Sequence, residues 1–286
     1  MPAAALTQGL VVALAIVMFG LGLTLTVDDF RRLRQHPRAV VLALGLQVLV
    51  LPAMAVLLIA VAGLQPLYAV GLMLLAASPG GVTANLFSHL FGGNVAMNLS
   101  LTAVNTVLSI VTLPLIANAA IAHYAGGGQV VPLQFGKVLE VVLVIGIPVL
   151  LGMVLQARRP ASAARLEGPM KAFSALVLAT VTVVAISKEW SALAASFAEL
   201  GGVVLAFNVL SLGAGYGVGR LARLPRDIAI AIGFEIGIHN STLAIFIALS
   251  VLQQFPLALP AALYSVSMYV TALLFGWWLG RGRRRA

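Results

Sequence analysis

Apolar residues fill most of this chain in long runs, and short polar segments separate the runs. Each run holds about 20 residues or more, the length that an α-helix needs to cross a hydrocarbon core about 30 Å thick. The pattern therefore predicts nine membrane-spanning helices rather than soluble domains. The expected ranges are 6–26, 38–63, 67–90, 94–121, 133–157, 169–187, 196–219, 227–252 and 257–280.

Composition supports this pattern. The 286 residues are 61% hydrophobic and 9% charged, whereas soluble domains are typically about 25% charged. The chain has no cysteine, which excludes disulfides and thiolate metal sites. Residues 1–8 have no basic segment, so we expect the first apolar run to be a retained helix and not a signal peptide. The predicted fold class is an all-α polytopic membrane protein forming a single transporter unit over residues 1–286.

Arginine placement predicts the orientation. Four arginine clusters follow the first, fifth, seventh and ninth spans, so all four lie on one side of the membrane, and the positive-inside rule makes that side cytoplasmic. We expect a multi-pass protein of the cell (inner) membrane with its N-terminus outside and its C-terminus in the cytoplasm. The same placement explains the net charge of +9 without a nucleic-acid partner. The clusters are Arg31, Arg32, Arg34 and Arg38; Arg158, Arg159 and Arg165; Arg220, Arg223 and Arg226; and Arg281, Arg283, Arg284 and Arg285.

Two spans carry polar or helix-breaking residues at their centres. The span 67–90 contains Ser78-Pro-Gly-Gly, and the span 227–252 contains Glu235, His239, Asn240 and Ser241 with two glycines. Glu235 is expected about 13 Å into the membrane, where a carboxylate usually faces a cavity, a partner or an ion. A Pro-Gly-Gly sequence alone also fits a simple kink. Because the two spans run in opposite directions, however, they are typical of inverted repeats whose two discontinuous helices meet at a transport site.

Other polar residues lie in the spans, and each has two readings. Asn98, Thr102, Asn105, Ser109 and Thr112 share one helical face by their spacing, which fits either polar contacts between helices or the lining of a wet path. Gln47 is either such a contact or a ligand, and Asn85 is either a helix cap or a ligand. His239 lies four residues after Glu235, so on a continuous helix the two share a face and can share a proton.

The chemistry of these groups favours a hard cation. Carboxylate, amide and hydroxyl oxygens from Glu235, Asn85, Asn98 and Thr102 suit sodium better than a soft metal. Helix N-termini freed by the interruptions point amide donors at the middle of the membrane and favour an anionic substrate. The residues thus predict a cation-coupled carrier of organic anions.

Three motifs resemble the bile acid:sodium symporter family, and the resemblance covers nearly the whole chain. They are Gly20-Leu-Gly-Leu-Thr-Leu-Thr-Val-Asp-Asp-Phe30, Ser78-Pro-Gly-Gly-Val-Thr-Ala-Asn85 followed by Gly93-Asn94-Val-Ala96, and Glu235-Ile-Gly-Ile-His-Asn-Ser241. The resemblance implies two crossing discontinuous helices near two sodium sites, and a core domain that moves like an elevator against a panel domain. The implied core covers 38–121, 196–252 and 257–280, and the implied panel covers 6–26, 133–157 and 169–187.

The resemblance also implies the ligands. The first sodium site would use Asn85, Asn98, Thr102 and Glu235; Ala84 stands where the family often has serine, and Asn98 replaces a usual serine. The second would use Gln47, Glu235, the carbonyls of Ile236 and Ile238, and the side chain of His239. The family commonly has glutamine at position 239, so the histidine leaves the second site in question and opens proton coupling through Glu235 and His239. Substrate contacts are expected at Thr83, Asn240 and Ser241.

These observations together predict a secondary transporter, a sodium-coupled symporter of an organic anion that works by alternating access. A proton-coupled carrier on the same fold is the first alternative, and a channel or a non-transporting membrane sensor is the second. An enzyme is not expected, because the chain lacks metalloprotease and nucleophilic-serine motifs. The partners expected are the organic anion and the lipid bilayer, with no obligate protein partner.

Overall fold

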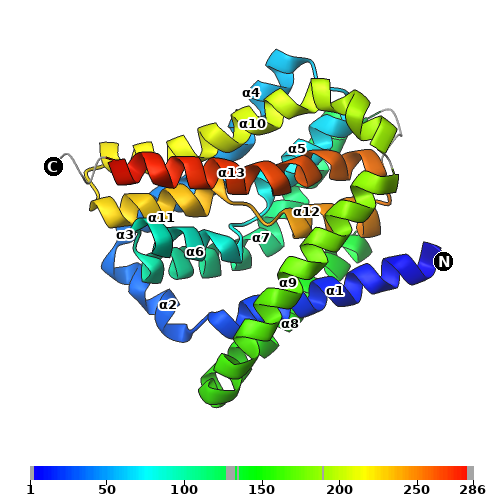
Figure 1. Cartoon of the computed structure of the whole chain (residues 1–286). Coiled ribbons are helices and arrows are strands. Elements are labelled where there is room, and N and C mark those ends of the chain that lie inside the picture. The colour runs from blue at the N-terminus through cyan, green and yellow to red at the C-terminus, as the bar shows by residue number, and fades with distance from the viewer. Residues whose placement is uncertain (1–2, 127–132, 134, 189, 282–286) are drawn as a thin grey trace.

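The computed structural model describes residues 3–126, 133, 135–188 and 190–281, and throughout these residues the regular elements are helices (Figure 1). This confirms the predicted all-α fold class. The α-helices are α1 (Ala3–Thr24), α2 (Val27–Arg32), α3 (Pro37–Gly45), α4 (Leu51–Ala62), α5 (Pro66–Ala77), α6 (Val82–Phe91), α7 (Val95–Tyr124), α8 (Phe135–Arg158), α9 (Pro160–Lys188), α10 (Trp190–Leu221), α11 (Arg226–Gly237), α12 (Ser241–Phe246) and α13 (Leu259–Arg281). Short 3₁₀ and π turns η1 (Leu33–Gln35), η2 (Leu46–Val50), η3 (Ile247–Val251) and η4 (Phe255–Ala258) link some of them.

Helix pairs α5–α6 and α11–α12 are each broken where the sequence predicts. The first break spans 78–81, and the second spans 238–240. The two extended segments run antiparallel: the Gly81 amide donates to the Ile238 carbonyl at 2.7 Å, and the Asn240 amide donates to the Pro79 carbonyl at 2.9 Å. Backbone groups freed by one break are thereby satisfied by the other, as a dry environment requires. The discontinuous helices therefore cross (Figure 1).

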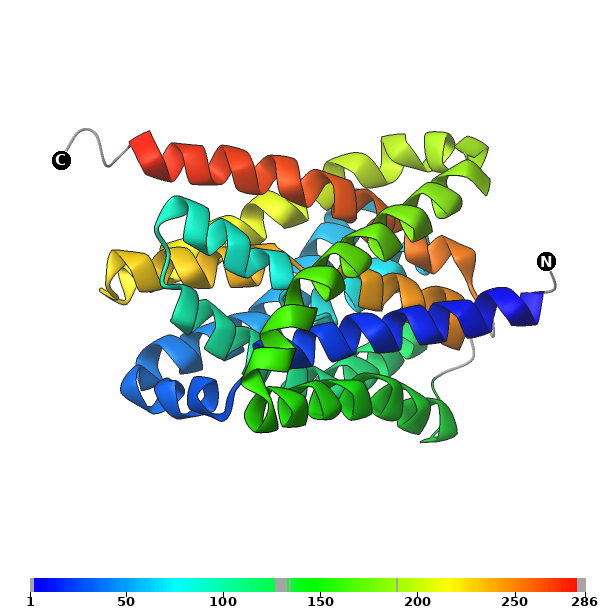
Figure 2. The same ribbon diagram turned by 60° about the horizontal axis from the view of Figure 1, so that its bottom comes forward.

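Helices α1, α8 and α9 pack together on one side of the molecule, as both ribbon views show (Figures 1 and 2). Glycines allow α1 and α8 to approach closely: a side chain at Gly22 would strike the Val149 carbonyl, and one at Gly152 would strike the Phe19 carbonyl. Small residues at helix contacts are common in membranes, where close van der Waals packing drives helix association. On the other side, α10 packs along α11 and α13.

Fewer than nine helices of the described chain are long and apolar enough to count as membrane spans. Five helical segments of the described chain pass such a test, or six if the bent pair formed by α1 and α2 is one span. The two broken spans fail because each half is short; Pro66–Ala77 and Ser241–Val251 are apolar but shorter. Each of the nine predicted ranges overlaps helix in the structure, while nine crossings remains a prediction.

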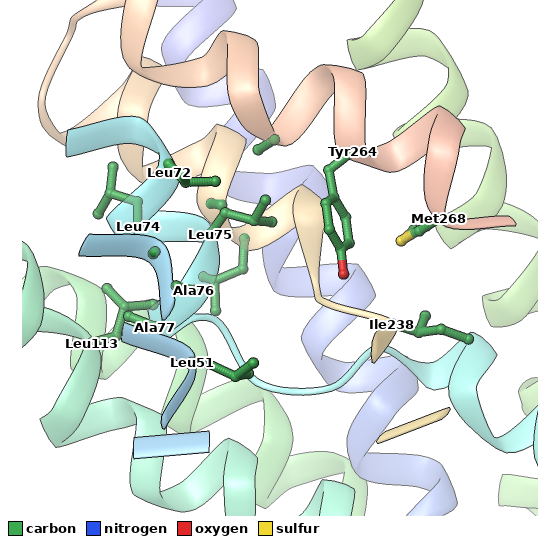
Figure 3. Close-up of a cluster of buried hydrophobic side chains, with 14 of the residues drawn as sticks. Leu51, Leu72, Leu74, Leu75, Ala76, Ala77, Leu113, Ile238, Tyr264 and Met268 are labelled. Atoms are coloured by element: carbon green, nitrogen blue, oxygen red, sulfur yellow. The ribbon is translucent and has the colours of Figure 1, made fainter. Parts of the chain in front are cut away.

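Apolar side chains surround the crossing on several sides. Figure 3 shows leucines of α5, including Leu72 and Leu75, on one side of Tyr264 of α13, and Ile238 of the second break on the other side in this view. All four of these residues are fully buried. In such dry surroundings a charged or polar side chain needs a partner inside the protein.

The arginine-rich segments lie towards one end of the molecule. Helix α2, the turn between α10 and α11 and the end of α13 lie at the end opposite the N-terminus (Figure 1). This arrangement agrees with a common side for the clusters, although the sidedness itself stays a prediction. Arg283, Arg284 and Arg285 of the predicted C-terminal cluster lie outside the described residues.

Candidate functional site

Glu235, in the last turn of α11, is completely buried. Its carboxylate accepts two hydrogen bonds from α7: Thr102 Oγ1 donates to Oε2 at 2.6 Å, and Asn105 Nδ2 donates to Oε1 at 2.9 Å. The ion pairs found among the described residues join other groups, Arg31 with Asp28 and Arg32 with Asp29. In the part of the chain that the structure describes, the hydrogen-bond donors to Glu235 are thus neutral. A carboxylate in a dry interior costs several kcal/mol unless a positive charge is also present.

Gly80, in the first break, brings the backbone of α5–α6 directly against this carboxylate. A Cβ atom at position 80 would collide with both carboxylate oxygens and the carboxyl carbon of Glu235. Only glycine leaves the carboxylate its place there. The Pro-Gly-Gly sequence and Glu235 therefore belong to one site.

Asn98 and Thr102 complete the α7 side of the site. Asn98 Nδ2 donates to Ser88 Oγ at 2.8 Å and to the Ala231 carbonyl at 2.9 Å, which ties α7 to α6 and α11. Its amide oxygen has no partner. The Thr102 hydroxyl lies 3.0 Å from the Asn98 carbonyl and closer to Glu235. Since Asn98 uses only its nitrogen for packing, its oxygen is left available to a ligand.

Buried polar atoms without a hydrogen-bond partner occur in several of the predicted site residues. Nine such side-chain atoms occur in the described residues, and six of them belong to residues predicted as ligands or substrate contacts. The nine are Gln47 Oε1, Asn85 Oδ1 and Nδ2, Asn98 Oδ1, Asn105 Oδ1, Thr106 Oγ1, His239 Nε2, Ser241 Oγ and Ser250 Oγ. Native proteins leave few buried polar atoms unpaired, so these atoms are candidates for contacts with water or a bound ligand.

Gln47 and His239 meet at the carbonyl of Ser78, beside the first break. Gln47, in η2, donates through Nε2 to the carbonyls of Ser78 at 3.0 Å and Ala76 at 3.2 Å. His239 Nδ1 lies 3.1 Å from the Ser78 carbonyl. Because a carbonyl can only accept, the network assigns the proton to Nδ1 and leaves Nε2 as an acceptor. The imidazole also stacks on Phe207, with ring centroids 5.6 Å apart.

The structure does not meet the condition under which Glu235 and His239 would share a helical face. Helix α11 ends at Gly237, so the chain is extended at position 239 and the two residues no longer share a helical face. Glu235 bonds to Thr102 and Asn105, whereas His239 bonds to the Ser78 carbonyl.

The remaining predicted residues lie at or next to the breaks. Asn240 caps α12, because its Oδ1 accepts from the Leu243 amide at 3.1 Å. Ser241 begins α12 with an unpaired hydroxyl. Thr83 lies in the first turn of α6 and is half-buried. Ile236 and Ile238 are fully buried, and the Ile238 carbonyl already accepts the Gly81 amide. The predicted residues named here therefore lie around one crossing of the two broken helices. Their roles as ligands remain predictions.

Sequence reasoning missed the residues that hold the other side of the break. The Gly237 carbonyl accepts from Asn208 Nδ2 at 3.0 Å and from the Tyr264 hydroxyl at 2.8 Å, and the Thr271 hydroxyl bonds to Asn208 Oδ1. Figure 3 shows the Tyr264 hydroxyl directed away from α13 towards the crossing. A lone amide in an apolar span was the available signal for Asn208, and no pattern marked Tyr264 or Thr271.

The amino-acid sequence matches a known protein family. The model of the "Sodium Bile acid symporter family" matches residues 11–196, more than half of the chain. The chain belongs to the sodium bile acid symporter family. This confirms the resemblance and the prediction of a transporter over an enzyme. The match ends before Glu235, so the second break rests on the structure.

Those relatives are similar along nearly the whole chain. A "Probable sodium/metabolite cotransporter BASS1, chloroplastic" of Arabidopsis thaliana is 28% identical over 272 residues, 94% of this chain and 66% of the relative. An "Uncharacterized sodium-dependent transporter YocS" of Bacillus subtilis is 28% identical over 261 residues, 88% of this chain and 77% of the relative. The human "P3 protein" is 29% identical over 252 residues, 88% of this chain and 52% of the relative. The chain spans about two thirds of the length of the plant relatives.

Proposed function

We propose that this chain is a secondary transporter that uses sodium to drive the symport of an organic anion by alternating access. The observation that carries the proposal is the crossing of two broken helices at a fully buried carboxylate, whose hydrogen-bond donors among the described residues are both neutral. Discontinuous helices crossing in an inverted arrangement are typical of secondary-transporter sites. The names of the plant and Bacillus relatives, a sodium/metabolite cotransporter and a sodium-dependent transporter, point the same way.

Sodium fits the groups present. Carboxylate and amide oxygens are hard ligands, and the side-chain oxygens of Asn98 in α7 and Asn85 in α6 are buried and unpaired. In this proposal the first sodium ion binds with Glu235, Asn98, Thr102 and Asn85. A second would use Gln47 and the carbonyls of Ile236 and Ile238. However, Gln47 Nε2 and His239 Nδ1 both hydrogen-bond to the Ser78 carbonyl. The remaining ring nitrogen of His239, Nε2, is neutral and is a weaker sodium ligand than an amide oxygen.

An organic anion fits the helix ends beside the sodium ligands. Helices α6 and α12 both begin at the crossing, and the start of a helix presents free amide donors and a positive dipole end. The hydroxyls of Thr83 and Ser241 and the side-chain Nδ2 of Asn240 supply further donors there. We infer that the substrate carries a carboxylate or a similar group, which these donors bind next to the cation.

Alternating access requires that one part of the protein move against another. We infer that α1, α8 and α9 form the panel and that the broken helices with α3–α4, α7, α10 and α13 form the moving core. The breaks tie α5–α6 to α11–α12 through backbone hydrogen bonds, so the crossing would move as one unit. The arginine placement supports an N-terminus outside and a C-terminus in the cytoplasm of the cell membrane.

Uptake into proteoliposomes tests the proposal. A panel of labelled organic acids, from bile acids to small carboxylates, is offered to reconstituted protein with sodium outside and then with choline in its place at the same pH. The proposal expects uptake of at least one acid that requires sodium, together with counterflow of label against unlabelled acid inside. Uptake that is unchanged in choline but follows a proton gradient would support a proton-coupled carrier instead, and uptake without counterflow would support a channel.

A further inference from the structure

Asn105 stands apart from the other polar residues of α7. It lies three residues beyond Thr102, is 1% exposed, and donates through Nδ2 to Oε1 of Glu235 at 2.9 Å. The polar residues further along the same face bond to their own helix instead. The Ser109 hydroxyl donates to the Thr106 carbonyl at 2.8 Å, and the Thr112 hydroxyl donates to the Leu108 carbonyl at 3.2 Å. Asn105 is thus the residue of this stripe, together with Thr102, that faces the buried carboxylate.

The amide oxygen of Asn105 is buried and has no partner. It shares one planar amide with the nitrogen that touches Glu235, so it lies close to the carboxylate as well. A purely structural role needs only the hydrogen bond that Asn105 Nδ2 donates to Glu235. It does not need a second polar atom, an unpaired acceptor, buried beside a negative charge. An oxygen in that position is unfavourable in an empty site and favourable next to a cation, because it then contributes a ligand.

We propose that Asn105 is an additional ligand of the cation bound at Glu235, with its amide oxygen on the cation and its N–H group on the carboxylate. This inference rests on the proposed function, since it assumes that sodium binds at Glu235. Two neutral amide oxygens of α7, from Asn98 and Asn105, then lie on either side of Thr102 and supply ligands from one rigid helix.

Sodium titration of purified full-length protein in detergent tests this role. Binding is measured as the sodium-dependent rise of Tm and by calorimetry, with choline keeping the ionic strength constant. Asn105→Leu keeps the volume and removes both polar atoms, and it should weaken sodium binding roughly 10- to 100-fold. Asn105→Asp restores the oxygen but removes the donor, and it should bind sodium within about tenfold of the parent and gain calcium-dependent stabilisation, since it pairs two carboxylates at one site.

Ser109→Ala is the matched control, because it removes a buried hydroxyl from the same face of α7 that bonds only to its own helix. We expect its sodium affinity to equal that of the parent. Equal affinity of Asn105→Leu and Ser109→Ala would overturn the proposal. Equal loss in the Leu and Asp variants would also overturn it, because the residue would then act through its N–H group alone. If Asn105→Leu does not fold, the Asp variant decides by keeping or losing sodium binding. A parent protein that binds no sodium would instead refute the proposed function.

Discussion

The broken helix α11–α12 has two buried polar sides that differ in one respect. On the α10 and α13 side, the Gly237 carbonyl, Asn208, Tyr264 and Thr271 complete one another's hydrogen bonds. On the α7 side, Glu235 has two donors, but the oxygens of Asn98 and Asn105 have no partner. Both sides are equally buried. Burial alone therefore does not distinguish a scaffold from a binding site, whereas hydrogen-bond satisfaction does.

The difference has a physical meaning. A completed network in a dry interior is rigid, because each group restrains the next. An unpaired buried acceptor costs about 1–3 kcal/mol, so several of them are retained only if a ligand repays that cost. The first side fixes the end of α11, and on the second side the proposed cation would use the unpaired oxygens. Substitutions on the two sides should consequently affect different properties.

The largest effect is expected from Glu235→Gln. The variant keeps the shape of the side chain and removes the charge that a cation needs, so sodium affinity should fall by at least about 100-fold, or roughly 2.7 kcal/mol. The protein should still fold, because the uncharged amide is easier to bury. Binding of radioactive sodium to the purified protein measures the loss, and an affinity equal to that of the parent would contradict the role of Glu235.

Gly80→Ala should have the next largest effect. The added methyl group would strike the Glu235 carboxylate, and overpacking of this kind costs about 1–3 kcal/mol of stability. Displacement of the carboxylate should also weaken sodium binding by about tenfold or more. Gly45→Ala is the control, because a methyl group there meets nothing within 4 Å; it should leave binding unchanged. Thermal melting and sodium titration of both variants provide the comparison, and similar results for the two would argue against close contact at position 80.

Asn208→Leu tests the α10 and α13 side, where the buried polar groups have their hydrogen-bond partners. It removes one donor from the Gly237 carbonyl and leaves the Thr271 hydroxyl without its amide partner, which should cost about 1–3 kcal/mol of stability. Sodium affinity should stay within about threefold of the parent, because the α7 ligands are untouched. Thermal melting with and without sodium separates the two effects. A loss of sodium binding without a loss of stability would show that the two sides are not distinct.

The smallest effect is expected from His239→Gln. The amide can keep the hydrogen bond to the Ser78 carbonyl, and its oxygen replaces a nitrogen that is a poor ligand for sodium. Sodium affinity should stay the same or rise, by up to about tenfold. Calorimetric titration measures the change. Abolished binding would mean that the imidazole itself is required and would contradict this reading of the second site.

Much of this architecture could be predicted from the sequence, because helix breakers and a buried acid stand out in apolar spans. The broken pairs, the closeness of Gly80 to Glu235 and the place of Asn98 and Thr102 followed from such signals. The roles of Asn208, Tyr264 and Thr271 could not be predicted, because each pairs across the fold with a residue that is distant in sequence. The sequence left the relation between His239 and Glu235 open, because their shared face required a continuous helix and the helix unwinds after Gly237.

Sodium titration of the unmodified protein tests the central claim most directly. The melting temperature is followed as sodium replaces choline at constant ionic strength and pH. Specific binding to the folded protein predicts a rise that continues with the logarithm of the sodium concentration above the dissociation constant. Because no positive side chain neutralises Glu235 in the described structure, we expect that rise with sodium and not with choline. An identical melting temperature in the two salts at every concentration would contradict a cation site at the crossing.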